Sequence, residues 1–164
     1  FMGKWSTYGL AVAVCACFLV AAPLESASAD PIKTRQAVMK ELSGHAKAFK
    51  KFFKGGKTKK AIARAGTAGD MVFRAMAIAS TAGRLPTLFP KGSGMGKTRA
   101  KPEIWLKMGE FKGKAANLKS AAMAVQTAAE GGDMAAIKTA FGKMGKACGG
   151  CHKQFRAKKK KKSS

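Results

Sequence analysis

Residues 134–155 read MAAIKTAFGKMGKACGGCHKQF, and this stretch decides the fold and the chemistry that the chain can have. Apolar side chains recur in it at steps of three and four residues, the spacing of one helix face. They are Met134, Ile137, Phe141, Met144, Cys148, Cys151 and Phe155. The stretch therefore predicts an amphipathic helix whose last turns carry Cys148-Gly149-Gly150-Cys151-His152.

Two cysteines three residues apart, followed at once by a histidine, have the spacing of c-type haem attachment. At about 100° per residue the three side chains share one helix face, so both sulfurs can bond haem vinyl carbons while the His152 imidazole binds iron. A redox dithiol would follow a strand, and a zinc site would need a second ligand pair, for which the mature chain offers only His45. We therefore predict one haem c, held by two thioethers from Cys148 and Cys151.

The first 29 residues are typical of a secretory signal. Lys4 gives a basic start, residues 10–22 are apolar without interruption, and Ala27-Ser28-Ala29 suits cleavage after Ala29. The apolar run is too short to span a bilayer, although an uncleaved anchor is the alternative. We expect a periplasmic protein with one domain, residues 30–164, whose two remaining cysteines hold haem and form no disulfide.

The charge is strongly basic, because 32 Lys and Arg against 8 Asp and Glu give +24. Lys4 and Glu25 of the signal cancel, so the mature chain keeps this charge. Such a surface favours an acidic redox protein or another anionic surface as partner, with membrane contact at most peripheral. Export and the lack of interleaved aromatics argue against nucleic acid. We expect Lys158 to Lys162 to form a solvated tail, beginning at about residue 157, or else a docking element.

Four stretches of the mature chain carry an apolar seam with helical spacing, and together they predict an all-α, antiparallel four-helix bundle. The other three seams are Ile32, Arg35, Met39, Leu42, Ala46, Phe49 and Phe53; Ile62, Ala65, Gly69, Val72, Met76 and Ala79; and Ile104, Met108, Phe111, Ala115, Leu118, Ala122 and Val125. Breaks are expected at Gly55-Gly56, at Gly131-Gly132 before an Asp133 cap, and over residues 83–101. Because many seam positions are Ala or Gly, haem between the helices would supply the missing apolar bulk.

Two further groups are candidates for contact with the haem. Arg35 is the one charged residue of the seams, and a buried guanidinium without a partner is costly, so we predict that a haem propionate pairs with it. The second axial ligand must come from another helix. Met39 lies in the first seam, and His45 points about 120° away from it. On the residues alone, Met39, His45 and the other methionines remain open.

The segments Arg35-Gln36-Ala37-Val38-Met39-Lys40, Lys101-Pro102-Glu103-Ile104-Trp105 and Cys148 through Arg156 together resemble the cytochrome c′ superfamily, over essentially the whole mature chain. In that family the residue four positions after the first-helix arginine faces the distal side of the haem. It is a bulky apolar residue in five-coordinate, gas-binding members and an iron-binding methionine in low-spin members of the cytochrome c-556 type. The resemblance thus implies Met39 as the second iron ligand and Arg156 as the proximal arginine.

The function predicted from these features is one-electron transport by a haem with His152 and Met39 as ligands, rather than an enzymatic reaction. A thioether ligand and a positive surface both favour the reduced iron. The alternative is a five-coordinate cytochrome c′ that binds nitric oxide or carbon monoxide. Family members often pair, so the resemblance also implies a possible homodimer.

Overall fold

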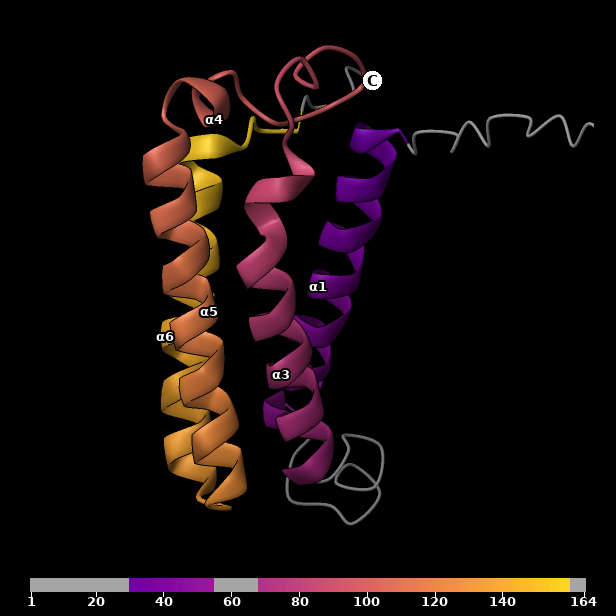
Figure 1. Cartoon of the computed structure of the whole chain (residues 1–164). Coiled ribbons are helices and arrows are strands. Elements are labelled where there is room, and N and C mark those ends of the chain that lie inside the picture. The colour runs from indigo at the N-terminus through magenta and orange to yellow at the C-terminus, as the bar shows by residue number, and fades with distance from the viewer. Residues whose placement is uncertain (1–29, 55–67, 160–164) are drawn as a thin grey trace, which may run out of the picture.

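A computed structural model describes residues 30–54 and 68–159 (Figure 1). Its helices are α1 (Pro31–Lys54), α3 (Ala68–Arg84), α4 (Glu103–Leu106), α5 (Met108–Glu130) and α6 (Met134–Phe155), with a 3₁₀ turn η1 at Leu85–Leu88. In the described part of the chain there is no strand, only an isolated bridge between Ala100 and Arg156. Figure 1 shows the long helices side by side with alternating chain direction. The predicted antiparallel four-helix bundle is confirmed.

The start of α6 follows the sequence closely. After α5 ends at Glu130, Gly132 adopts a φ of 72°, a left-handed conformation that glycine takes without strain. Asp133 is the N-cap, and its Oδ1 accepts hydrogen bonds from the backbone N–H groups of Ala135 at 2.8 Å and Ala136 at 3.3 Å. Both donors would otherwise lack a partner at the helix terminus. The predicted break and cap are therefore confirmed.

The third predicted helix is wrong as one continuous element. Lys107, with φ −122° and ψ 44°, separates α4 from α5. Its N–H donates to the Glu103 carbonyl at 2.8 Å and closes α4, while its own carbonyl accepts from Phe111 N–H at 3.0 Å and opens α5. The interruption turns the α4 residues Ile104 and Trp105 toward the connection that precedes them.

The predicted seam of the second helix is only partly correct. Ala79 is buried and Val72 is half-buried as expected, but the rest of the buried face is shifted. Gly69 is exposed and Met76 is 51% exposed, whereas Met71, Ala75 and Ile78 are buried. Alanine and other apolar residues of α3 itself occupy most of its sides. The apolar period therefore does not determine which side turns toward the core. The expected positions Ile62 and Ala65, and the Gly55-Gly56 break, lie outside the described residues.

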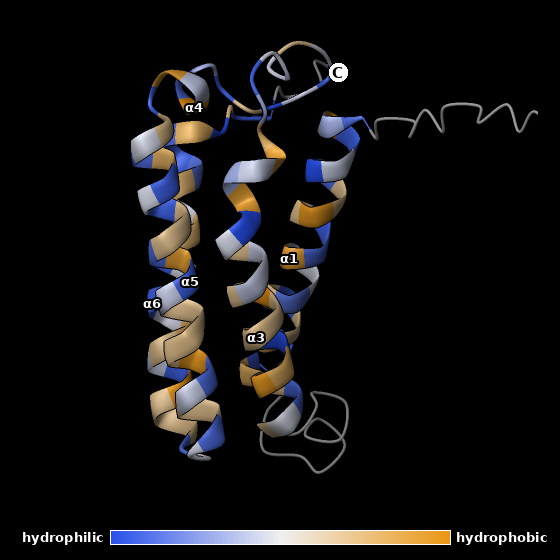
Figure 2. Cartoon of the chain, viewed as in Figure 1, coloured by the Kyte–Doolittle hydropathy of each residue, from blue (hydrophilic) through white to orange (hydrophobic). Residues whose placement is uncertain are grey.

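Two groups of buried side chains form the core. The main cluster joins α1, α3, η1, α5 and α6, and its largest buried side chains include Phe49, Ile137 and Met144. The end cluster consists of Phe89, Ile104, Phe111 and Phe155, at the end of the bundle that carries α4. Helix α5 packs extensively on both α3 and α6, and α1 packs on α3. Figure 2 shows that each long helix mixes hydrophilic and apolar residues, as amphipathic helices around a shared core do.

Among the helices of the described residues, none combines the length and the apolar character that crossing a membrane requires.

Candidate haem site

The predicted attachment residues lie on the last two turns of α6, and residues 148–152 are called the tether segment here. Cys148 and Cys151 are free thiols, both half-buried. Cys148 packs against the main cluster and Cys151 against the end cluster, so both thiols lie on the core-facing side of α6. The following residue, His152, is exposed.

Electrostatics keep these groups neutral near pH 7. Burial raises the pKa of the Cys148 and Cys151 thiols, so both remain protonated. The pKa of His152 is lowered, first by partial desolvation of its imidazole on the side toward the protein and then by the positive charges of Arg156 and Arg99. A neutral imidazole has a free nitrogen lone pair, which is the form that binds a metal.

Met39 of α1 lies at the same height in the bundle as the tether segment. The Phe49 ring of α1 stacks on the Phe141 ring of α6 with 5.0 Å between centroids, which fixes the register of the two antiparallel helices. Met39 precedes Phe49 by ten residues and Cys151 follows Phe141 by ten, so each lies about 15 Å from the stacked pair at 1.5 Å per residue. Met39 is half-buried and packs against both clusters, including the one that Cys151 contacts.

Arg35 is buried, with 3% of its surface exposed. Its Nη1 donates to Ser93 Oγ at 3.0 Å, and its Nη2 donates to the Ser93 carbonyl at 2.7 Å and to Thr98 Oγ1 at 3.1 Å. The guanidinium also lies over the Phe89 and Trp105 rings, at 5.1 and 5.8 Å from their centroids. Neutral oxygens and ring faces therefore accept this group, and the negative charge of Asp30 also acts on it. These contacts use three of its five N–H donors, and a contact with a propionate stays a prediction.

Arg156 is the C-cap of α6, and its N–H donates to the His152 carbonyl at 3.1 Å. Its side chain is exposed. It forms the isolated bridge with Ala100, and its charge acts on His152 together with that of Arg99. Arg156 thus lies next to the tether segment through its backbone, and its role as the proximal arginine stays a prediction.

His45, the other ligand candidate, lies between α1 and α3. Its side chain is 14% exposed, its Nε2 is 3.8 Å from a Glu41 oxygen, and its ring meets the Phe73 ring of α3 edge-on at 6.4 Å between centroids. These contacts direct the imidazole along α1 and toward α3. Met39, and not His45, shares the end cluster with the tether segment.

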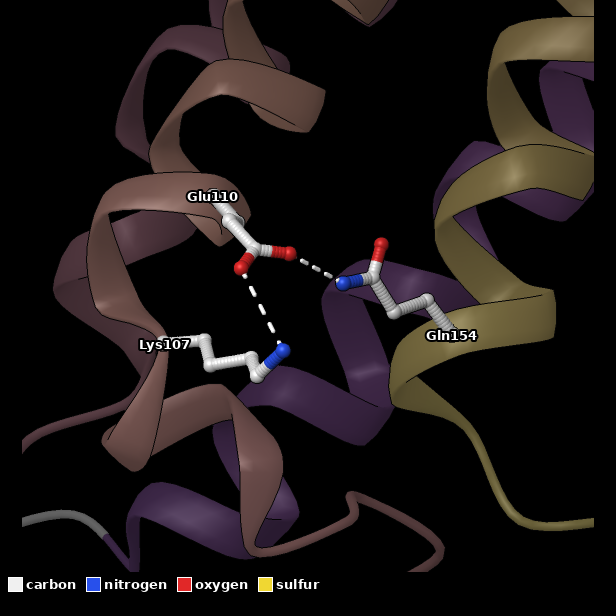
Figure 3. Close-up of polar contacts among 3 residues, drawn as sticks. All are labelled: Lys107, Glu110 and Gln154. Atoms are coloured by element: carbon white, nitrogen blue, oxygen red, sulfur yellow. Dashed lines mark hydrogen bonds and ion pairs between the residues drawn. The ribbon is translucent and has the colours of Figure 1, made fainter.

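A polar cluster beside the tether segment was not predicted. Gln154 of α6 donates through Nε2 to Glu110 of α5, and Lys107 Nζ lies 3.4 Å from the other Glu110 oxygen (Figure 3). The hydrogen bond from Gln154 is the main cause of the lowered pKa of Glu110. The three residues lie on α6, α5 and the junction between α4 and α5, so no local spacing in the sequence could have revealed the contact.

The donor set fits covalent haem better than a bare metal ion. In the described part of the chain, no group of three or more His, Cys, Asp or Glu side chains converges as a metal site requires. The two thiols instead follow each other along one helix face, with the imidazole next to them and a thioether at the same height on α1. Two sulfurs for the vinyl carbons and one nitrogen for iron are what haem c requires.

Comparisons with known proteins show which family the chain resembles. Residues 30–156 match the model of the family described as cytochrome C′. The cytochrome c-556 of Agrobacterium fabrum is 34% identical over 132 residues, which cover 80% of this chain and 84% of that protein. The cytochrome c′ of Pararhodospirillum photometricum is 43% identical over 83 residues, covering 50% of this chain and 66% of that protein, slightly less than two thirds of its length. The solved cytochrome c′ of Rhodopseudomonas palustris has a TM-score of 0.69 at 32% identity, covering 80% of this chain and 98% of that one.

Proposed function

This chain belongs to the cytochrome c′ family of haem-bearing electron carriers, and on that premise we propose that it is a one-electron carrier with His152 and Met39 as its iron ligands. The observation that supports this proposal is the position of Met39. It packs on the cluster that Cys151 also contacts, at the height set by the stacking of Phe49 on Phe141.

When bound, the haem supplies a reversible one-electron couple between Fe(III) and Fe(II). The residues of the chain then have separate tasks. Cys148 and Cys151 would attach the group to α6, and the neutral imidazole of His152 and the soft sulfur of Met39 on α1 would be its iron ligands. Arg156 places a positive charge beside His152. With Met39 as a ligand, an external molecule would find no free iron position, so the proposed task is electron transfer and not catalysis.

The rival function is a five-coordinate site that binds a gas. It has support from the family, because one structural neighbour, 25% identical, is described as the nitric oxide complex of a mutant cytochrome c prime from Alcaligenes xylosoxidans. That function requires Met39 to stay off the iron. The side chain at position 39 therefore separates the two functions.

The test is Met39→Leu in protein that carries haem. Leucine has a similar volume, so the fold should lose less than about 1.5 kcal/mol. We expect the wild type to be low-spin and not to bind carbon monoxide readily, and the variant to become high-spin and to bind it. Met108→Leu is the matched control, since Met108 is also half-buried against the end cluster but lies on α5. A wild-type protein that is already high-spin would refute the proposal.

The partner follows from charge. From residue 134 to residue 162 the chain contains no Asp or Glu, and this acid-free stretch includes the tether segment and the lysine tail. Lys50 of α1 and Lys114 of α5 add positive charge near Cys148 and Cys151. We therefore infer an acidic redox protein as partner, met in the periplasm after export of residues 30–164. A neighbour 30% identical is described as a cytochrome c′ with ligand-controlled dimer dissociation, which supports a homodimer for this chain as well.

A further inference from the structure

The connection between η1 and α4, residues 89–101, contacts both helices that carry the proposed iron ligands. On the α1 side, Arg35 donates to Ser93 and Thr98, and Gln36 Nε2 donates to the Lys97 carbonyl at 2.8 Å. Arg35 and Gln36 lie about one turn before Met39 on α1. The connection therefore holds the part of α1 next to the proposed ligand.

On the α6 side, the same connection pairs with the residues that follow the tether segment. Lys101 N–H donates to the Phe155 carbonyl at 3.0 Å, and Ala157 N–H donates to the Arg99 carbonyl at 2.8 Å. The Arg99 Nε returns a hydrogen bond to the Ala157 carbonyl at 3.0 Å. One short segment thus joins the ends of α1 and α6. In the described residues, the ring contacts between these two helices lie farther along the bundle and involve Phe49, Phe53 and Phe141.

Close packing fixes the shape of the connection between these two attachments. A Cβ on Gly94 would lie 3.2 Å from the Trp105 ring, and Gly96 has a φ of +113° with Ile32 Cδ1 3.0 Å from where a Cβ would stand. The Trp105 Nε1 donates to the Pro90 carbonyl at 2.9 Å. Only glycine fits both positions without displacing a neighbouring side chain, so packing constrains the conformation of this segment.

We propose that residues 89–101 form a clamp that sets the separation between the Met39 turn of α1 and the tether end of α6, and thereby positions Met39 relative to His152. In Figure 1, α1 tilts away from α6 toward its N-terminal end, where the clamp attaches. Ser93 and Thr98 are the positioning residues, because they act through Arg35 and touch neither sulfur nor imidazole. The proposed clamp depends on the proposed function in one respect only, because that function identifies the group that Met39 binds.

The two hydroxyls are the points at which the clamp can be weakened. Ser93 Oγ donates to the Pro90 carbonyl at 2.8 Å while it accepts from Arg35, and Thr98 Oγ1 accepts from both Arg35 and the Ala100 N–H. Removing both hydroxyls takes two acceptors from a buried cation and one from a backbone donor. Leaving buried donors without an acceptor costs at least about 1.4 kcal/mol of clamp stability. That loss raises about tenfold the equilibrium constant for local opening of the clamp, from which amide hydrogens exchange.

The test is the double variant Ser93→Ala with Thr98→Val in haem-loaded protein. We expect at least about tenfold faster amide hydrogen exchange in residues 32–40 and 153–158, together with a larger high-spin fraction of the oxidised protein. Thr87→Val is the matched control, since its hydroxyl donates to the Arg84 carbonyl outside the clamp. Ser93→Ala with Thr98→Ser keeps the hydroxyl at position 98. In this variant the exchange rates and the high-spin fraction should both return toward wild type.

Two results would overturn the clamp: exchange that rises only within residues 89–101, or unchanged exchange in α1 and α6. Faster exchange in α1 without any change in spin state would also refute the positioning of Met39, provided that the wild type is low-spin. If the wild type is high-spin, the proposed ligation fails, and the exchange of residues 32–40 and 153–158 alone then decides the clamp.

Discussion

Phe49 gives the sharpest test of how the bundle holds its register. Its side chain is 1% exposed, belongs to the main cluster and stacks on Phe141 of α6. The contact joins α1 to α6 and sets Met39 at the same height as the tether segment. Phe49→Ala would remove the ring from the centre of this contact and leave a cavity between the two helices.

The expected loss follows from burial and ring geometry. Truncating a fully buried phenylalanine to alanine costs about 3–5 kcal/mol, and the stacked pair places Phe49 in the upper part of that range. Such a loss is a large share of the roughly 5–15 kcal/mol by which domains are stable. For a domain of this size it corresponds to a decrease in melting temperature on the order of 10–20 °C.

The assay is denaturation by guanidinium chloride and by heat, followed by helical circular dichroism in haem-loaded protein. Phe73→Ala is the matched control, because Phe73 is 66% exposed on α3 and the same truncation should change the stability by less than about 1 kcal/mol. Phe49→Leu keeps most of the apolar volume and should lie between the two. Equal losses for Phe49→Ala and Phe73→Ala would refute the view that Phe49 anchors α1.

Two further predictions concern charge. Electron transfer to an acidic partner should slow steeply as salt rises, since the Debye length is about 8 Å at physiological ionic strength, and deletion of Lys158 to Lys162 should flatten this dependence; a rate independent of salt would contradict the docking role. The lowered pKa of Glu110 means that its hydrogen bond with Gln154 stabilises the fold above the ordinary carboxyl pKa, and this contribution disappears as the pH falls through the lower folded value. Gln154→Leu should move the Glu110 titration, followed by NMR, back up toward the ordinary range, and an unmoved midpoint would exclude the contact in solution.

The sequence was most informative where large apolar residues and strong end signals occur together. Helix α6 begins and ends where its pattern predicts, because Asp133 caps its start and Ile137, Met144 and Phe155 are buried at helical spacing. The seam from Phe111 to Val125 is buried as expected for the same reason. In α3 the pattern was only partly correct, since an alanine-rich helix offers several similar apolar faces and its neighbours decide which one is buried.

The candidate site could be proposed from the sequence where its chemistry is local. The tether segment is a contiguous motif, and Met39 stands four residues after Arg35. The contacts of Arg35 could not be predicted, because its acceptors lie 58 and 63 residues away and are neutral hydroxyl and carbonyl oxygens. The interruption at Lys107 was equally hidden, since no proline or glycine occupies that position.

The distribution of small and large residues bears on how α1 is held beside α6 at the height of Met39. Buried alanines on α3, at positions 75, 79 and 82, and on α5, at positions 115, 122 and 129, let these two helices pack closely along their lengths. Helix α1 has a different arrangement, because Phe49 anchors it near one end and Arg35 near the other. The turns between these anchors, including Met39, are therefore the part of α1 whose distance from α6 depends on both attachments, so a planar group held by Cys148 and Cys151 would meet α1 there.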